Sequence, residues 1–189
     1  MARVPSEYAT NTVACKLWSL VNDGSPTEFI LGLALFDELS NLYPDCRCWI
    51  YSCSDFFANS QWLQQRPDVF ILVPQLNIPN VGHVDFAIFD PHISTQNPLV
   101  VVECDGHNFH ERTSDQASED RRRDRVLQWL GYPLLRFTGT DIVRNKTEVA
   151  REIAEFVDQR LSEKHAHLAE VAEREAEFTE LMYHRYGVL

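Results

Sequence analysis

The chain is short of basic residues. Its 189 residues include 17 Lys and Arg against 28 Asp and Glu, which gives a formal net charge of -11. Because proteins bind nucleic acid largely through contacts from Lys and Arg to phosphate, this balance excludes a protein that coats nucleic acid by bulk electrostatic attraction. Any contact with nucleic acid must therefore come from a local group of basic side chains.

Two further features are missing from the sequence. No apolar run approaches the roughly 18 to 20 residues of a membrane-spanning helix, and the segment from Met1 to Thr10 lacks the basic and apolar stretches of a signal peptide. The five cysteines are an odd number, which argues against a disulfide framework. We therefore expect a soluble, cytoplasmic protein with reduced thiols and no membrane partner.

The length and the apolar content allow one sizeable core rather than two, since 44% of the 189 residues are hydrophobic. From Thr147 onward, apolar residues recur at helical spacing with no glycine or proline before Gly187. We expect an α/β domain over residues 1–146 and a long C-terminal helix over residues 147–189, packed on the core at first and projecting later. Its last apolar positions predict self-association as a homodimer or binding of a protein partner.

Two short apolar stretches are predicted to be neighbouring strands. Residues 82–89 alternate apolar and polar side chains, the pattern of a half-buried strand. Residues 99–102 form a continuous run of strand formers, typical of a strand covered on both faces. Further strands are predicted at 69–76 and 134–137, with helices before, between and after them. The order predicts an α/β fold with a central mixed four-stranded sheet flanked by helices.

Both central strands carry acid. Asp85 lies within the first, and the second runs directly into Glu103 and Asp105, which share one face of an extended chain about 6.6 to 6.8 Å apart. Two carboxylates 4 Å apart repel by roughly 4 kcal/mol at an effective dielectric near 20, so such a site raises a carboxyl pKa or binds a cation. Oxygen ligands favour magnesium or calcium.

The sequence therefore predicts a divalent-metal site, and removal of any one of these charges should relieve repulsion. The alternative is that Asp85 faces water and Asp105 belongs to a turn, since Asp-Gly is a common turn pair.

Helices are expected on both sides of these strands. Ser25 caps a helix with Pro26 at its first position, and Glu28 stands where it can close a capping box, which is sufficient to explain it. A second helix runs from Ser114 or Asp115 to about Leu130, and four of its residues fall on one face: Arg123, Val126, Leu127 and Leu130. Three other arginines fall elsewhere and can reach phosphates: Arg121, Arg122 and Arg125. Alternatively, they pair with acids of the same helix, namely Glu119, Asp120 and Asp124.

Asp85, a spacer of 17 residues and then Glu103-Cys104-Asp105, with strands around them, resemble the PD-(D/E)XK nuclease superfamily. Within it, VDFAIFD, VVVECDGHNFH, RRRDRVLQWLGY and LLRFTGTDI, spread over about residues 25–145, resemble the uncharacterised endonuclease-like (DUF559-type) family related to very short patch repair endonucleases. Asp105 stands where the superfamily pattern has lysine.

The resemblance implies a restriction-endonuclease-like core and a magnesium-dependent nuclease that hydrolyses phosphodiester bonds, with DNA as the expected substrate and Mn²⁺ able to replace Mg²⁺. The residues to which it gives catalytic roles are Glu28, Asp85, Glu103, Asp105 and His110. The expected metal ligands are Asp85, Glu103 and the backbone carbonyl of Cys104, with Asp105 and Glu28 as further candidates. Contacts to nucleic acid are expected from Arg121, Arg122 and Arg125.

Two other functions remain open. A catalytically silent nuclease fold that serves as a binding or assembly module is favoured by the missing lysine, the acidic charge and the long C-terminal helix. A zinc hydrolase using His107 and His110 is the other, although the spacing of these histidines lacks the helical two-histidine pattern of zinc proteases.

Overall fold

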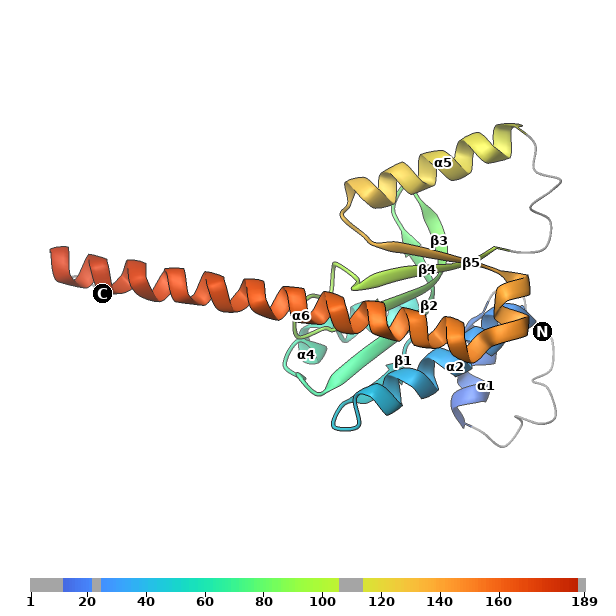
Figure 1. Cartoon of the computed structure of the whole chain (residues 1–189), viewed down its shortest axis with the longest axis horizontal. Coiled ribbons are helices and arrows are strands. Elements are labelled where there is room, and N and C mark those ends of the chain that lie inside the picture. Colours follow the sequence, from blue (N-terminus) through green and yellow to red (C-terminus); the bar gives the residue numbers. More distant parts are fainter. Residues whose placement is uncertain (1–11, 22–24, 106–113, 187–189) are drawn as a thin grey trace. The chain divides into compact units, whose positions relative to one another are not determined.

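The computed structural model describes residues 12–21, 25–105 and 114–186, and the side chains of all of these except 114–117 and 186. Figure 1 shows the elements, which are in chain order α1 (Thr12–Leu20), α2 (Pro26–Leu42), β1 (Arg47–Ile50), α3 (Cys53–Ala58), α4 (Ser60–Leu63), β2 (Val69–Ile78), β3 (Gly82–Phe89), β4 (Val100–Asp105), α5 (Ser114–Trp129), β5 (Leu134–Thr138) and α6 (Gly139–Tyr186). No helix in the described part of the chain is long and apolar enough to cross a membrane.

The described strands form one mixed sheet in the order β1-β2-β3-β4-β5. β1 runs parallel to β2 and β4 runs parallel to β5, whereas β3 is antiparallel to both of its neighbours. This confirms the predicted α/β fold, with a mixed sheet flanked by helices and a long C-terminal helix. The sheet has one strand more than expected. β1 is only four residues long, too short to show an alternating pattern, and lies in a stretch rich in cysteine and aromatic residues.

Helix α2 begins as its sequence predicts. The Ser25 hydroxyl accepts a hydrogen bond from the Glu28 backbone N–H at 3.4 Å, and Pro26 occupies the first turn. Gly32 then allows a close approach, because a Cβ built there would lie 2.7 Å from Leu17 Cδ2 and 3.1 Å from Phe86 Cε1. α2 can therefore contact both α1 and the sheet, where a larger residue would separate them.

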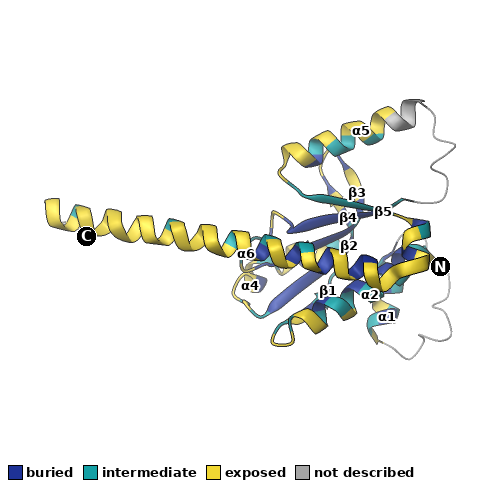
Figure 2. Ribbon diagram, in the orientation of Figure 1, coloured by how far each residue is buried: buried dark blue, intermediate teal, exposed yellow. Residues whose placement is uncertain are grey.

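Both faces of the sheet are covered, as the buried strands in Figure 2 show. On one face, residues of α3, α4 and α5 (Phe56, Leu63 and Leu127) join a cluster with strand residues that include Ile71, Val73, Ala87, Phe89 and Val101. The other face carries α1, α2 and the first part of α6, which Arg151 connects to Glu38 of α2 at 3.6 Å.

Aromatic side chains pack beside the edge strand β1. Trp49 of β1 stacks on Trp62 of α4, with ring centroids 5.7 Å apart and planes 9° from parallel. The Arg66 guanidinium lies 5.6 Å from the first ring centroid and 5.3 Å from the second, within the range of a cation–π contact.

Helix α6 is kinked at Asn145, whose φ of -140° and ψ of 42° are not helical. The kink separates a short helix from the long one, which is consistent with the helical pattern that begins at Thr147. The chain divides into two compact units, residues 1–155 and 156–189. The division of roles expected between residues 1–146 and 147–189 stays a prediction.

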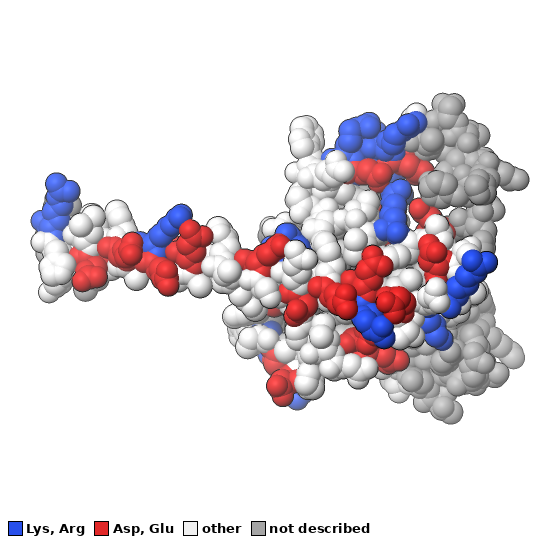
Figure 3. Space-filling view, in the orientation of Figure 1, with Lys and Arg blue, Asp and Glu red and all other residues white. Residues whose placement is uncertain are grey.

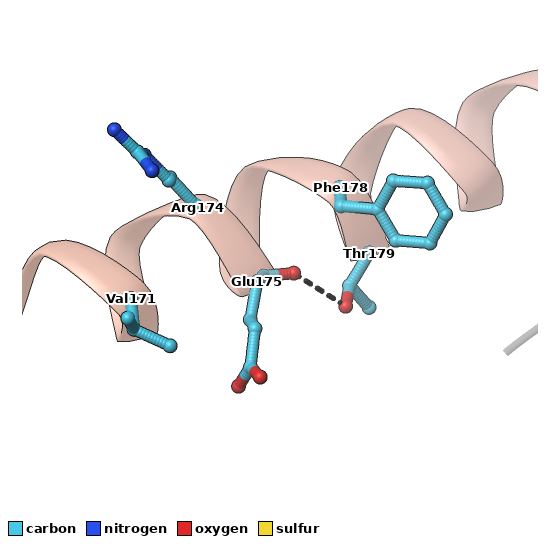
Figure 4. A pocket seen from close by; sticks show the side chains of 5 residues that line it. All are labelled: Val171, Arg174, Glu175, Phe178 and Thr179. Carbon is cyan, nitrogen blue, oxygen red and sulfur yellow. Dashed lines mark hydrogen bonds between the residues drawn. The ribbon is translucent and has the colours of Figure 1, made fainter. Parts of the chain in front are cut away.

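In the second unit, only the first two turns carry buried residues within the described part: Val157 and Leu161. Further along, the larger apolar side chains are exposed, among them Leu168, Phe178, Leu181 and Tyr183. Figure 4 shows a hollow on this helix lined by Val171, Arg174, Glu175, Phe178 and Thr179, in which the Thr179 hydroxyl donates to the Glu175 carbonyl at 2.8 Å. The first four of these residues have the i, i+3, i+4, i+7 spacing of a hole in a coiled-coil seam.

We expect truncation after Ser162 to leave the core folded. The described residues beyond it are not buried, so the free energy of unfolding should change by no more than about 0.5 kcal/mol in urea denaturation. Loss of the cooperative transition in the 1–162 protein would contradict this division.

Candidate active site

Four polar residues occupy corresponding positions on four successive strands. Gln75 of β2 lies between the residues that pair with Phe86 and Val84, and therefore across from Asp85 of β3. One step beyond the Phe86–Val102 pair, Asp85 lies across from Glu103 of β4. Glu103 in turn is in register with Arg136 of β5. The sheet register alone thus brings two acids, an amide and an arginine into one row.

Gln75 interrupts the regular alternation of β2. Its φ of 52° lies in the left-handed region, which residues other than glycine seldom adopt. Val73 before it and Leu76 after it belong to the same buried cluster, although a regular strand would place positions 73 and 76 on opposite faces. The Gln75 amide lies between two carboxylates at this point: its Nε2 is 2.9 Å from Glu28 Oε2 and 3.4 Å from Asp85 Oδ1.

Asp85 is held by neutral donors. Besides Gln75, the backbone N–H of Cys104 donates to Asp85 Oδ2 at 2.7 Å. Burial raises the pKa of the Asp85 carboxyl and the charge of Asp105 adds to this, although the two hydrogen bonds and the charge of Arg123 act in the opposite direction. Asp85 is therefore a carboxylate whose charge is disfavoured where it stands.

Glu103 is held by two arginines instead. It is 7% exposed, and its two oxygens each lie 2.9 Å from a guanidinium, Oε1 from Arg123 of α5 and Oε2 from Arg136 of β5. Arg123 also donates to the carbonyls of Val81 and His83, at 3.0 and 2.8 Å. Burial raises the pKa of the Glu103 carboxyl, while the two guanidinium charges act to lower it.

All four predicted carboxylates act on Cys104. Burial raises the pKa of its thiol, and the carboxylates that raise it further are, in order of effect, Asp85, Glu28, Glu103 and Asp105. Gln75 and the Cys104 backbone N–H connect two of these acids, Glu28 of α2 and Asp85 of β3, to the end of β4, which carries the other two. Their catalytic and metal-binding roles stay predictions.

The donor set fits a hard divalent cation in chemistry and in charge. The oxygens are carboxylates, and four carboxylates against the two arginines leave an excess of two negative charges. In the described part of the chain, however, no three His, Cys, Asp or Glu side chains converge closely enough to hold an ion. The reason is that Gln75 connects Glu28 to Asp85 while the arginines hold Glu103. Ion binding requires one of these contacts to give way.

The other predicted site residues lie elsewhere. His110 falls in residues 106–113, outside the described part of the chain. Three predicted nucleic-acid contacts lie on the exposed surface of α5, where Figure 3 shows basic side chains gathered: Arg121, Arg122 and Arg125. Arg122 binds Glu119 at 3.0 Å, so for this residue the alternative of pairing within the helix is confirmed.

Sequence reasoning missed three residues of the site: Gln75, Arg123 and Arg136. Arg123 did leave a signal, because a charged residue on an otherwise apolar helix face needs a buried partner. The signal for Arg136 was weaker: it is a charged residue among the apolar residues of a strand. Nothing in the sequence indicates the left-handed backbone of Gln75.

We expect Asp85→Asn and Glu103→Gln to have opposite effects on the metal-free protein. The amide introduced by Asp85→Asn would keep an acceptor for the Cys104 N–H and remove a disfavoured charge, so the free energy of unfolding should rise. Glu103→Gln would leave two half-buried guanidinium groups without a charged partner, which should cost about 1 to 3 kcal/mol. This corrects, for Glu103, the expectation that removing either charge relieves repulsion.

The pH dependence of the free energy of unfolding tests the prediction for Asp85→Asn. Because its pKa is raised on folding, the folded protein binds the proton more tightly, and stability falls as pH rises from the ordinary aspartate pKa through the raised one. Urea denaturation between about pH 7 and pH 5 should show a larger gain of stability on acidification in wild type than in Asp85→Asn, which retains only the raised pKa of Glu103. Identical profiles would contradict the assignment.

Residues 67–157 match the model of a restriction-endonuclease-like family, REase_MTES_1575. No curated protein and no solved structure matches the chain. The matched span includes Asp85, Glu103 and both arginines, whereas Glu28 precedes it. Together with the helix-flanked mixed sheet, the match supports a restriction-endonuclease-like, nuclease-type fold for this chain.

Proposed function

We propose that the chain is a metal-dependent endonuclease that hydrolyses phosphodiester bonds in DNA, related to the DUF559-type endonuclease-like family. One observation carries the proposal: hydrogen bonds of the Gln75 amide and of the Cys104 backbone N–H connect Glu28 and Asp85 to the end of β4, where Glu103 and Asp105 lie. Three of these four acids lie in the span that matches the endonuclease-like family. An excess of negative charge in a buried site is unfavourable unless a cation or a proton offsets it.

In this proposal Asp85, Glu103 and the Cys104 carbonyl would hold Mg²⁺ or Mn²⁺, with Asp105 and Glu28 as further ligands. The ion would supply a lowered pKa for its bound water and would offset the charge that develops on the phosphate. Asp105 would orient the attacking water by accepting its hydrogen bond, and His110 would exchange protons near neutral pH. Gln75 would keep Glu28 and Asp85 at a fixed separation.

A second candidate function is a catalytically silent nuclease fold that acts as a binding or assembly module. The specific observation in its favour is that both oxygens of Glu103 already bind arginine. The presence of Asp105 where the superfamily pattern has lysine also favours a silent module.

We also propose that the C-terminal helix serves self-association or a protein partner rather than chemistry. Its exposed apolar side chains and the hollow around Phe178 support this. Glutamates dominate its charges, so a homodimer would favour an antiparallel arrangement, and a different partner would be basic.

The first test measures cleavage and ion binding on the same samples. We expect wild type to nick plasmid DNA with Mg²⁺ or Mn²⁺ and not with EDTA, and Asp85→Asn to lose this activity. Saturating Mn²⁺, at about 100 times the dissociation constant, should stabilise wild type by roughly 2.7 kcal/mol in thermal unfolding and should not stabilise Asp85→Asn.

Asp37→Asn is the matched control, because Asp37 is an exposed aspartate of α2. It should behave as wild type. Full activity in Asp85→Asn would remove the site assignment. A wild type that neither cleaves nor gains stability from Mn²⁺ would favour the silent module.

The second test concerns Arg121, Arg122 and Arg125. Replacing all three by Gln should weaken DNA binding and lower the slope of log affinity against log salt by roughly 0.7 to 0.9 for each phosphate that is no longer neutralised. Fluorescence anisotropy over a range of salt concentrations measures the slope. Arg174→Gln, which removes an exposed arginine paired with Glu170, is the control and should leave it unchanged. An unchanged slope in the triple variant would mean that these arginines only pair with acids of their own helix.

A further inference from the structure

The inner face of helix α5 contacts the core and the candidate site. Arg123 reaches Glu103 at 2.9 Å, and Leu127, four residues later, is completely buried. Asp124 accepts a hydrogen bond from Arg136 at 2.7 Å. These contacts fix the rotation of the helix about its axis, and therefore also fix which residues it presents to solvent.

The outer face is basic and ends in an aromatic ring. Successive residues of an α-helix turn by about 100°, so Arg121, Arg125, Trp129 and Arg122 fall, in this angular order, within an arc of about 100°. All four are exposed. Between residues 118 and 129 every acid falls outside this arc: Glu119, Asp120 and Asp124. On a chain with a net charge of -11, such a face is a local basic surface of the kind that contact with nucleic acid would require.

Trp129 is 93% exposed. A single exposed apolar side chain needs no explanation by itself. Here, however, the ring continues the line of Arg121 and Arg125, at positions i, i+4 and i+8 of one helix. A basic track with an aromatic side chain is the arrangement by which proteins bind single strands, with phosphates on the cations and a base stacked on the ring.

We propose that the outer face of α5, made by Arg121, Arg122, Arg125 and Trp129, binds a single-stranded segment of the substrate with an unpaired base stacked on Trp129. In a duplex the base faces are covered by their neighbours, so an exposed ring gains most from an unpaired base. This inference rests on the proposed nuclease function and adds to it the class of substrate, a nucleic acid that contains unpaired nucleotides.

The dimensions are consistent with a short segment. From Arg121 to Trp129 the helix rises about 12 Å, the length of three to four nucleotides at a spacing of about 3.4 Å. The Arg122–Glu119 ion pair does not prevent phosphate binding, because both side chains are more than half exposed and such pairs are weak. An α-helix is about 10 to 12 Å across, so nucleotides on the outer face lie beside the carboxylates and not over them. The face is therefore an accessory binding site.

Binding in EDTA tests the inference without cleavage. Fluorescence anisotropy would compare a labelled oligothymidylate of about 12 nucleotides, within the site sizes of single-strand binding proteins, with a duplex of equal length. Trp129→Ala should weaken binding of the single strand by about 5- to 150-fold, the effect of removing one base–ring stack, and binding of the duplex by less than about 2-fold. The slope of log affinity against log salt should not change, since every cation that meets a phosphate is retained.

Leu130→Ala is the matched control. Leu130 is also exposed and adjacent in sequence, but lies about 100° around the helix from Trp129, and its replacement should leave both affinities unchanged. Trp129→Phe should retain part of the single-strand affinity. The tryptophan fluorescence of wild type should be quenched by the oligothymidylate, and the three tryptophans remaining in Trp129→Ala should not respond.

The inference would be overturned if wild type and Trp129→Ala bound the single strand equally well, or if Trp129→Ala weakened binding of the single strand and of the duplex by the same factor. It would also be overturned if poly-glutamate bound as tightly as the oligonucleotide, because the face would then be a docking site for acidic protein. If wild type cleaves DNA while Trp129→Ala binds single strands normally, the nuclease proposal stands without this inference. If the protein never cleaves DNA but binds single strands through Trp129, the single-strand binding site stands and the nuclease proposal fails.

Discussion

The end of the sheet depends on how the charge of Glu103 is compensated. A carboxylate that is 7% exposed is costly unless it is paired and hydrogen-bonded, and here each oxygen binds a different guanidinium. The two arginines come from different elements, α5 and β5, so the one acid joins both of them to β4. Arg123 extends the connection to the turn between β2 and β3 through the carbonyl of Val81, and to the start of β3 through the carbonyl of His83.

Much of the fold could be predicted because its signals are local. The cap at Ser25 and the alternation over residues 82–89 need no knowledge of distant residues, and both appear in the structure. β1 could not be predicted, because four residues show no period and its pairing with β2 depends on a partner about 20 residues away. In α2, the helical spacing of Phe29, Leu33 and Phe36 predicts one buried stripe. Leu33 and Phe36 are nevertheless half-buried, while Leu31 and Leu35 are buried, because two layers pack against this helix rather than one.

The residues of the candidate site also fall into those that the sequence could predict and those that it could not. The acids could be found because charge at the end of an apolar strand is unusual in any fold. Their partners could not, because they come from elements far apart in sequence: Gln75 binds a helix residue 47 positions away, and Arg123 binds a strand residue 20 positions away. Spacing therefore singled out Asp85 and Glu103, which lie across from each other on β3 and β4, but not that an amide would hold the first and arginines the second.

These two sets of contacts impose opposing demands on any cation site. The arginines stabilise Glu103 in the metal-free protein, yet they compete with an ion for its oxygens, and a unit-charge pair at 4 Å is worth roughly 4 kcal/mol at an effective dielectric near 20. A guanidinium that leaves Glu103 needs another anion, and on the proposed function the phosphate of the substrate is the anion that arrives. Ion and nucleic acid would then favour release of the same arginine. Because such coupling is reciprocal, each would bind more tightly in the presence of the other. The contact that holds the fold together at Glu103 would thereby also make ion binding depend on substrate.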